Sequence, residues 1–165
     1  MKFFQAVNLP ITILLFLLLS VGIAVISSSS INLGLQQLAL ALLGIFLYIF
    51  IASSDYRAIT NLIRPIYLLT LLSLVLVLIL GIETRGSIRW IPIGPVHIQP
   101  SEFAKPVVIL FLADFWSKRK VTWQNISKSF FWLLPFLALV FKQPDLGTTL
   151  TLVVVWLGSL FAAGI

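Results

Sequence analysis

Along this chain, long runs of hydrophobic residues alternate with short polar segments. A helix that crosses a bilayer needs about 20 residues, so the shorter runs are ambiguous between spans and buried or re-entrant segments. We interpret them as spans whose polar ends turn inward, where polar groups and irregular backbone are tolerated. The pattern therefore predicts an all-α fold, a polytopic transmembrane bundle of about six spans. The six runs are residues 10–26, 38–52, 66–82, 103–116, 130–141 and 146–165.

The first run follows Lys2 and offers an alternative interpretation as a signal peptide. Its length of about 17 apolar positions exceeds the usual 7 to 15 residues of a signal-peptide core. The polar residues 27–30 also lead directly into further apolar sequence. We therefore favour a retained first span.

The composition indicates a membrane protein and argues against thiol chemistry and a nucleic-acid partner. Hydrophobic residues make up 60% of the chain and charged residues only 10%, whereas soluble proteins have about a quarter charged. The chain has no cysteine, which excludes disulfides and a thiol nucleophile. The net charge of +6 does not indicate a nucleic-acid partner, because the basic residues lie in short loops rather than on one face.

The loop charges predict the orientation of the spans. With a cytoplasmic N-terminus, seven of the eleven basic residues lie inside, which agrees with the positive-inside rule. This orientation places residues 85–105 on the outer side. No linker divides the chain, so we predict a single transmembrane domain over residues 1–165. Its last run ends without a closing polar segment, so we also expect it to be the N-terminal portion of a longer protein. The seven inner basic residues are Lys2, Arg57, Arg64, Lys118, Arg119, Lys120 and Lys128.

Residues 85–105 form the first polar segment, a costly feature between membrane spans and therefore a candidate site. Arg85, Arg89 and Lys105 provide a basic set suited to phosphate or pyrophosphate. Trp90 is typical of an aromatic anchor at the interface. No second His or Cys exists, so the histidine of this segment is interpreted as a loop residue rather than a metal ligand.

The end of the first polar segment predicts a helix start. Ser101 is a preferred N-cap residue, and Glu102 in the first turn is favoured by the helix dipole. Spacings of three and four residues place Ser101, Glu102 and Lys105 along one side of the helix. Two interpretations stay open. The group is either a capped helix with a local ion pair, or one wall of a polar site that Lys105 faces.

The second polar segment is KQPDLGTT, residues 142–149. Asp145 lies between a proline and a glycine, where its carboxylate can cap the last helix without any further role. The alternative is that Asp145 and Gln143 face the same outer cavity as the first polar segment. In that case Asp145 pairs with Lys105 and neutralises its charge. The residues alone thus indicate an outward polar site suited to an anionic amphiphile.

The two polar segments also resemble a known family. GSIRWIPIGPVHIQPSEFAK, followed by QPDLGT, is similar to the two signature regions of the SEDS proteins of shape, elongation, division and sporulation. RodA and FtsW typify this family. The resemblance runs through essentially the whole chain, but only through the N-terminal part of an architecture of about ten helices. The sequence KQPDLGT and the short N-terminus slightly favour the RodA-like branch.

The resemblance implies a function. Members are peptidoglycan glycosyltransferases of the bacterial cytoplasmic membrane, which polymerise lipid II during elongation or division. They work with a class B penicillin-binding protein. A lipid II flippase and a non-catalytic scaffold fragment are the alternatives. The resemblance implies no cofactor. A divalent cation is compatible with the substrate, although the sequence shows no ligand cluster for one.

The resemblance also implies roles for individual residues. The Asp regarded as catalytic in the family lies in a large extracytoplasmic loop of the C-terminal half, so no residue here inherits that role. Some members carry Arg where this chain has His97. The positions implied as structural are Trp90, Pro100, Pro144 and Gly147. Those expected to bind substrate are Arg89, Gln99, Ser101, Glu102, Lys105, Gln143 and Asp145, together with Arg85 from the basic set of the first polar segment.

Overall fold

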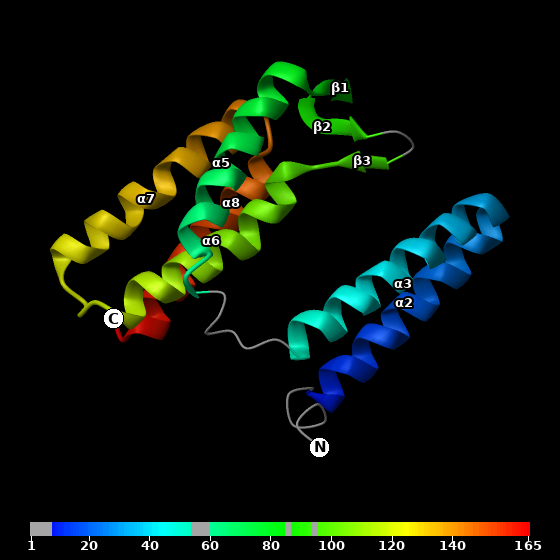
Figure 1. The fold of residues 1–165 in the computed structure, drawn as a ribbon, viewed down its shortest axis with the longest axis horizontal. Coiled ribbons are helices and arrows are strands. Elements are labelled where there is room, and N and C mark those ends of the chain that lie inside the picture. The colour runs from blue at the N-terminus through cyan, green and yellow to red at the C-terminus, as the bar shows by residue number, and fades with distance from the viewer. Residues whose placement is uncertain (1–7, 54–59, 85–86, 94–95) are drawn as a thin grey trace. The chain divides into compact units, whose positions relative to one another are not determined.

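The computed structural model describes residues 8–53, 60–84, 87–93 and 96–165 (Figure 1). Contacts divide the chain into two compact units, Met1–Ala58 and Ile59–Ile165. The predicted single transmembrane domain stays a prediction, and each unit is described by itself. In the order of the chain, the elements are α2 (Leu9–Ser29), α3 (Ile31–Ser53), α5 (Ile63–Leu80), β1 (Ile82–Thr84), β2 (Ser87–Ile93), β3 (Val96–Ile98), α6 (Pro100–Ser117), α7 (Trp123–Lys142) and α8 (Leu146–Ala163).

Each of the six predicted apolar runs forms a helix in the described part of the chain. Five of these helices are long and apolar enough to cross a membrane. The other helix, α6, contains Glu102, Lys105 and Asp114. Its 18 residues still extend about 27 Å, close to the thickness of a hydrocarbon core. The two short runs became α6 and α7 because their polar flanking residues continue the helix, and the predicted all-α transmembrane bundle is confirmed.

The first unit contains the hairpin of α2 and α3, whose residues include no Asp, Glu, Lys, Arg or His. The two helices lie close together at Gly34, where an added Cβ would lie 2.9 Å from Ser27 Cα. A 2.7 Å hydrogen bond between the hydroxyls of Thr12 and Tyr48 also joins them. No residue of α2 is buried. A helix that is apolar on every side requires lipid or further helices around it.

The second unit packs α5, α6, α7 and α8 side by side (Figure 1). Tyr67 of α5 lies at the centre, with its ring 4.5 Å from Phe111 and 5.0 Å from Phe136. Its hydroxyl donates a 2.5 Å hydrogen bond to the Trp132 carbonyl of α7. These contacts join three helices in one core. Aliphatic side chains complete it, namely Leu74, Val107, Val108, Leu112, Leu133, Val140 and Leu152.

A small antiparallel sheet, in the order β1-β2-β3, connects α5 to α6. Ile82 pairs with Trp90, and Ile91 pairs with Ile98. The predicted all-α fold includes no strand in this stretch. Strand pairing satisfies the backbone hydrogen bonds of a segment that leaves one helix and enters the next. Two-residue gaps between the three strands, each containing a glycine, are a hairpin signal that was missed.

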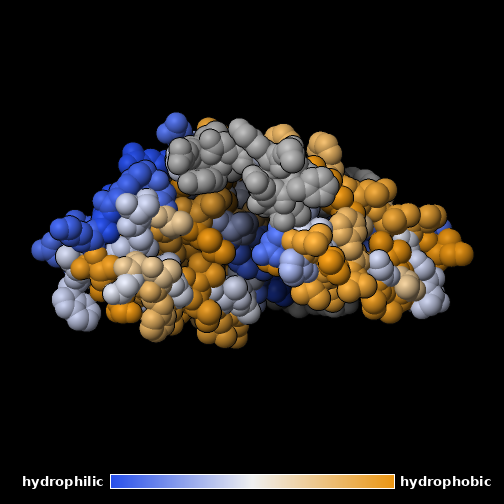
Figure 2. Space-filling model, turned by 90° about the horizontal axis from the view of Figure 1, so that it is seen from below, coloured by the Kyte–Doolittle hydropathy of each residue, from blue (hydrophilic) through white to orange (hydrophobic). Residues whose placement is uncertain are grey.

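The outer surface of the helices is largely apolar. On the face seen in Figure 2, hydrophobic residues cover most of the described helices. Many Leu, Ile, Val and Phe side chains are more than half exposed. Soluble monomers rarely expose apolar patches above a few hundred Å². These surfaces therefore suit contact with lipid, and the described charged residues lie near the helix ends or between the helices.

Candidate functional site

Asp145 is the centre of the candidate site. It is the N-cap of α8, as the sequence predicted. Its Oδ1 accepts a 3.1 Å hydrogen bond from Thr148 N, and its Oδ2 accepts one of 2.9 Å from the Thr148 hydroxyl. The side chain is only 8% exposed. The cap therefore fixes a nearly buried carboxylate at the start of α8.

Two residues of the first polar segment reach this carboxylate. Arg89 of β2 places Nη1 at 3.5 Å from Asp145 Oδ1. Gln99, which precedes α6, donates from Nε2 to Asp145 Oδ2 at 3.3 Å and to Ser101 Oγ at 3.0 Å. The sheet and the starts of α6 and α8 thus meet at one place. We call Arg89, Gln99, Ser101, Asp145 and Thr148 the Asp145 network.

The predicted pairing of Asp145 with Lys105 is wrong. Lys105 instead contacts Glu102 of the preceding turn, with Nζ 2.7 Å from Oε2. The local pair forms because the two residues are three apart on α6. Arg89 takes the place beside Asp145, and it reaches there from a strand that the sequence analysis did not foresee.

The predicted N-cap at Ser101 is also wrong. The helix begins at Pro100, and Gln99 is the N-cap residue. Proline suits the first helical position because its φ is fixed and its missing N–H needs no partner there. Ser101 is fully buried inside the Asp145 network, whereas the Glu102 side chain is 54% exposed. Ser101 and Glu102 therefore face different sides of α6, and the ion-pair interpretation describes Glu102 and Lys105.

The surroundings of Asp145 set its charge. Burial by itself would raise the pKa of this carboxyl. The hydrogen bonds from the Thr148 N–H and hydroxyl and the nearby Arg89 guanidinium outweigh burial, so the pKa lies below its ordinary value. Asp145 is consequently ionised at neutral pH and presents a fixed negative charge to Arg89.

Gln143 lies apart from the Asp145 network. It is completely buried, and its Nε2 donates a 3.2 Å hydrogen bond to the Leu74 carbonyl of α5. Its Oε1 has no hydrogen-bond partner among the described residues. The structure therefore shows Gln143 as a link between α5 and the end of α7, and its substrate-binding role stays a prediction.

The remaining residues singled out from the sequence that the structure describes lie at several different places, none of them in the Asp145 network. Arg85 lies outside the described residues. Trp90 is half-buried in β2, and His97 is exposed in β3 rather than in a loop. A Cβ at Gly147 would make an ordinary 3.8 Å contact with Asp145 Oδ1, so sterics alone do not require glycine there. Pro144 is exposed between α7 and α8. The expected roles of all these residues stay predictions.

Sequence reasoning missed the hydrogen bond from the Thr148 hydroxyl to Asp145. An N-cap Asp followed three residues later by a donor is a local signal that could have found it. Within the described ranges, no three His, Cys, Asp or Glu residues gather to hold a metal ion. The predictions about cofactors and a divalent cation stay predictions.

Comparison with known proteins matches this geometry to a family. A family model described as "Cell cycle protein", covering FtsW, RodA and SpoVE, matches residues 2–165. The chain belongs to the FtsW/RodA/SpoVE family. A probable peptidoglycan glycosyltransferase FtsW from Aeromonas salmonicida is 37% identical over 107 residues, which is 61% of this chain and 26% of that protein. The corresponding protein from Pseudoalteromonas translucida is 42% identical over 106 residues, covering 61% and 27%.

Solved structures of FtsW/RodA/SpoVE relatives show the same fold. The crystal structure of the rod shape determining protein RodA from Thermus thermophilus has a TM-score of 0.82 and 30% identity, covering 96% of this chain and 54% of that one. A structure of a peptidoglycan synthase complex, concerned with polymerization and crosslinking, has a TM-score of 0.85 and 28% identity, covering 95% and 48%. The chain spans about half the length of these structures.

Family membership and the apolar helices make this a multi-pass bacterial membrane protein. The sequence relatives are FtsW proteins, whereas a solved neighbour is RodA. The slight lean toward the RodA-like branch therefore stays a prediction.

Proposed function

We propose that the whole protein is a peptidoglycan glycosyltransferase that polymerises lipid II in cell-wall synthesis. One observation carries the proposal. The two signature segments, with Gln99 and Asp145 separated by 46 positions, meet around one nearly buried carboxylate. Relatives named as probable peptidoglycan glycosyltransferases support the reaction. In this proposal, this chain forms part of the substrate site, and the catalytic Asp belongs to the C-terminal half.

Two basic residues near the sheet, Arg89 and Lys105, suit a lipid-linked pyrophosphate. The side chains of Arg89 and Lys105 are each 30% exposed, so solvent and ligand reach them. Asp145 orients the Arg89 guanidinium, and Glu102 orients Lys105. A pyrophosphate would then accept hydrogen bonds from a planar guanidinium and from an ammonium group. We assign the two carboxylates positioning roles, since neither attracts the substrate itself.

An apolar cavity beside β2 supports the lipid part of the substrate. The cavity measures about 320 Å³ and lies between α5, β2 and α6. Its walls include Leu69, Ile91, Ile98 and Phe103. A polyprenyl chain can lie against such walls while its pyrophosphate faces the basic residues.

The proposal also includes orientation and partners. With the N-terminus in the cytoplasm, the sheet end of the bundle faces the outer side of the cytoplasmic membrane, where glycan strands are built. A class B penicillin-binding protein would crosslink them. The similarity to a peptidoglycan synthase complex supports such a partner.

The test is polymerisation of purified lipid II by the whole protein in detergent. Lys105→Ala and Glu102→Ala are expected to lower the rate, because one removes a cation and the other its positioning partner. Lys142→Gln is the control, as it removes an exposed cation next to the second signature segment. Full activity of both site variants would refute their assigned roles.

The same preparations separate the alternatives. Lipid II translocation in liposomes, persisting after the catalytic Asp of the C-terminal half is removed, would show a flippase. A whole protein that neither polymerises nor translocates lipid II would show a non-catalytic scaffold.

A further inference from the structure

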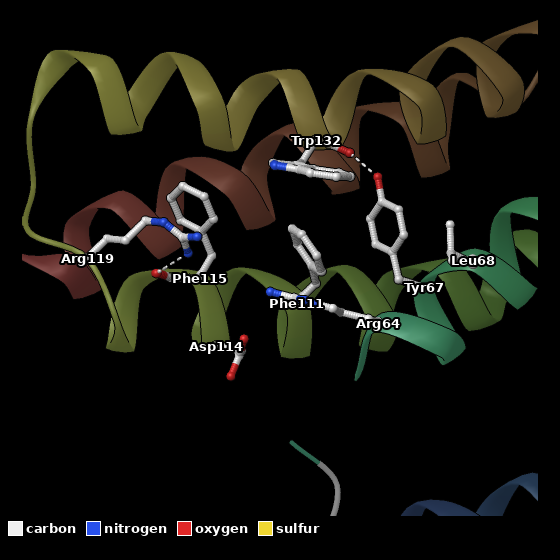
Figure 3. A pocket seen from close by; sticks show the side chains of 8 residues that line it. All are labelled: Arg64, Tyr67, Leu68, Phe111, Asp114, Phe115, Arg119 and Trp132. Atoms are coloured by element: carbon white, nitrogen blue, oxygen red, sulfur yellow. Dashed lines mark hydrogen bonds between the residues drawn. The ribbon is translucent and has the colours of Figure 1, made fainter. Parts of the chain in front are cut away.

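The end of the second unit that lies opposite the sheet contains a cavity unrelated to the Asp145 network. It measures about 340 Å³ and opens between α5, α6 and α7 (Figure 3). Arg64 comes from the first turn of α5, and Arg119 follows the C-cap of α6. Both arginines are exposed and line the cavity. The cavity is large enough for a phosphodiester with its glycerol unit.

The Arg119 guanidinium is held in place from one side. Its Nη1 donates a 3.3 Å hydrogen bond to the Phe115 carbonyl, and its Cζ lies 4.2 Å from the centre of the Phe115 ring. Figure 3 shows the guanidinium beside this ring, with its hydrogen bond dashed. A guanidinium has five N–H donors. The other donors can therefore serve a ligand without any movement of the side chain.

Arg64 is a cation in an unfavourable place. The first turn of a helix carries the positive end of the dipole and disfavours a basic side chain. Among the described residues, the Arg64 side chain makes no hydrogen bond and no ion pair, and the carboxylate that shares its cavity, Asp114, is paired with Lys118. Folding of α5 alone therefore does not explain an arginine here, whereas an anion in the cavity would.

The carboxylate in the cavity lining does not cancel these charges. Asp114 is paired with Lys118, one turn further along α6. In Figure 3, the Asp114 carboxylate points away from the Trp132 ring, on the other side of α6. The lining of the cavity consequently includes two guanidinium groups and one carboxylate, and that carboxylate is already paired with Lys118.

The inner wall of the cavity is aromatic. The Phe111 ring lies 4.5 Å from Tyr67 and 5.6 Å from Trp132. The Tyr67 hydroxyl is already used in its hydrogen bond to the Trp132 carbonyl. Phe111 lies eight residues before Arg119 in the chain, which corresponds to about 12 Å along a helix. The cavity thus passes from cationic to apolar over the distance between a lipid phosphate and the upper acyl chain.

We propose that this cavity binds the phosphate group of an anionic phospholipid from the leaflet at that end. Arg64 and Arg119 contact the phosphate, and the aromatic wall contacts the glycerol and the first acyl carbons. A free phosphate ester shares the charge but would gain nothing from the aromatic wall. This site is separate from the proposed lipid II site, so either can fail without the other.

The test is lipid binding to the whole protein, measured by native mass spectrometry with phosphatidylglycerol and phosphatidylcholine. The wild type is expected to prefer phosphatidylglycerol. Arg64→Gln and Arg119→Gln are each expected to weaken its binding about fivefold, and the double variant about 25-fold, if each contact contributes independently. Lys128→Gln is the matched control, because Lys128 is an exposed cation of the same end outside the cavity.

Asp114→Asn gives a test in the opposite direction. It removes a negative charge from the cavity lining and frees Lys118, so phosphatidylglycerol should bind up to about fivefold more tightly. An unchanged preference in the double arginine variant, or no preference in the wild type, would overturn the proposal. Displacement of the lipid by soluble glycerol phosphate at equal concentration would assign the cavity to a free phosphate ester and also overturn it.

Discussion

The two ends of the α5–α8 bundle use charge in opposite ways. At the sheet end, a nearly buried carboxylate accepts hydrogen bonds from Thr148 and Gln99 and forms an ion pair with Arg89. At the other end, Arg64 and Arg119 border an open cavity whose carboxylate is paired elsewhere. Closed contacts fix the relative positions of elements, whereas unpaired charges remain available for ligands. The comparison therefore separates a cation that a buried carboxylate holds in position, as Asp145 holds Arg89, from cations that border an open cavity without such a carboxylate among the described residues.

The largest expected effect is on stability at the sheet end. Asp145→Ala removes the cap of α8, for about 1 kcal/mol, and leaves the buried partner groups of the carboxylate unsatisfied, for about 1–3 kcal/mol more. Asp114→Ala at the other end breaks a surface ion pair and should cost less than about 1 kcal/mol. Thermal unfolding of the whole protein in detergent measures both. Equal losses would contradict the contrast between the two ends.

The second-largest effect is expected from acid, which should lower the contribution of the sheet end to folding stability. The pKa of Asp145 is lower in the folded protein than in the unfolded chain, so its stabilising contribution is complete above the unfolded pKa of about 4. That contribution is lost as the pH falls through the lower, folded pKa. The melting temperature of the wild type should therefore fall more steeply below about pH 4 than that of Asp145→Asn. Parallel curves would contradict this.

A smaller effect is expected from the hydrogen bond near the open end. Tyr67→Phe removes the bond to the Trp132 carbonyl but keeps the buried ring, so unfolding should become easier by about 1 kcal/mol. Thr12→Val removes a comparable hydrogen bond in the other unit, because the Thr12 hydroxyl is hydrogen-bonded to Tyr48 in the α2–α3 hairpin. Thr12→Val should cost no more than Tyr67→Phe. Chemical unfolding in mixed micelles would rank the two variants.

The smallest effect is expected at Gln143. Gln143→Leu removes one hydrogen bond to the Leu74 carbonyl, but it also removes a buried oxygen that has no partner among the described residues. These terms oppose each other, and the net change should be below about 0.5 kcal/mol. A loss as large as that of Asp145→Ala would indicate that Gln143 has a further partner.

The sequence predicted the helices well because their signal is local. Apolar runs and the rarity of charge determine a transmembrane helix, and Asp145 was identified as a cap from its neighbours alone. The starts of α6 and α7 were harder to place, since these helices begin at Pro100 and Trp123, before the apolar runs at residues 103 and 130.

The contacts of the Asp145 network could not be read from the sequence. Spacing predicted the Glu102–Lys105 pair, because both residues lie on one helix. Arg89 reaches Asp145 only because β2 pairs with its neighbours and packs beside α5 and α6. Without the sheet, Lys105 appeared to be the natural partner. Contacts between distant segments depend on register and packing, which a single sequence does not specify.

The most direct test of the central claim is the rate of lipid II polymerisation by Asp145→Asn in the whole protein. Asn still caps α8 but lacks the charge that holds Arg89. The account predicts that kcat/KM falls about tenfold, the value expected for losing one charge-assisted contact, while Lys142→Gln polymerises normally. A well-folded Asp145→Asn protein that polymerises lipid II at the wild-type rate would contradict it.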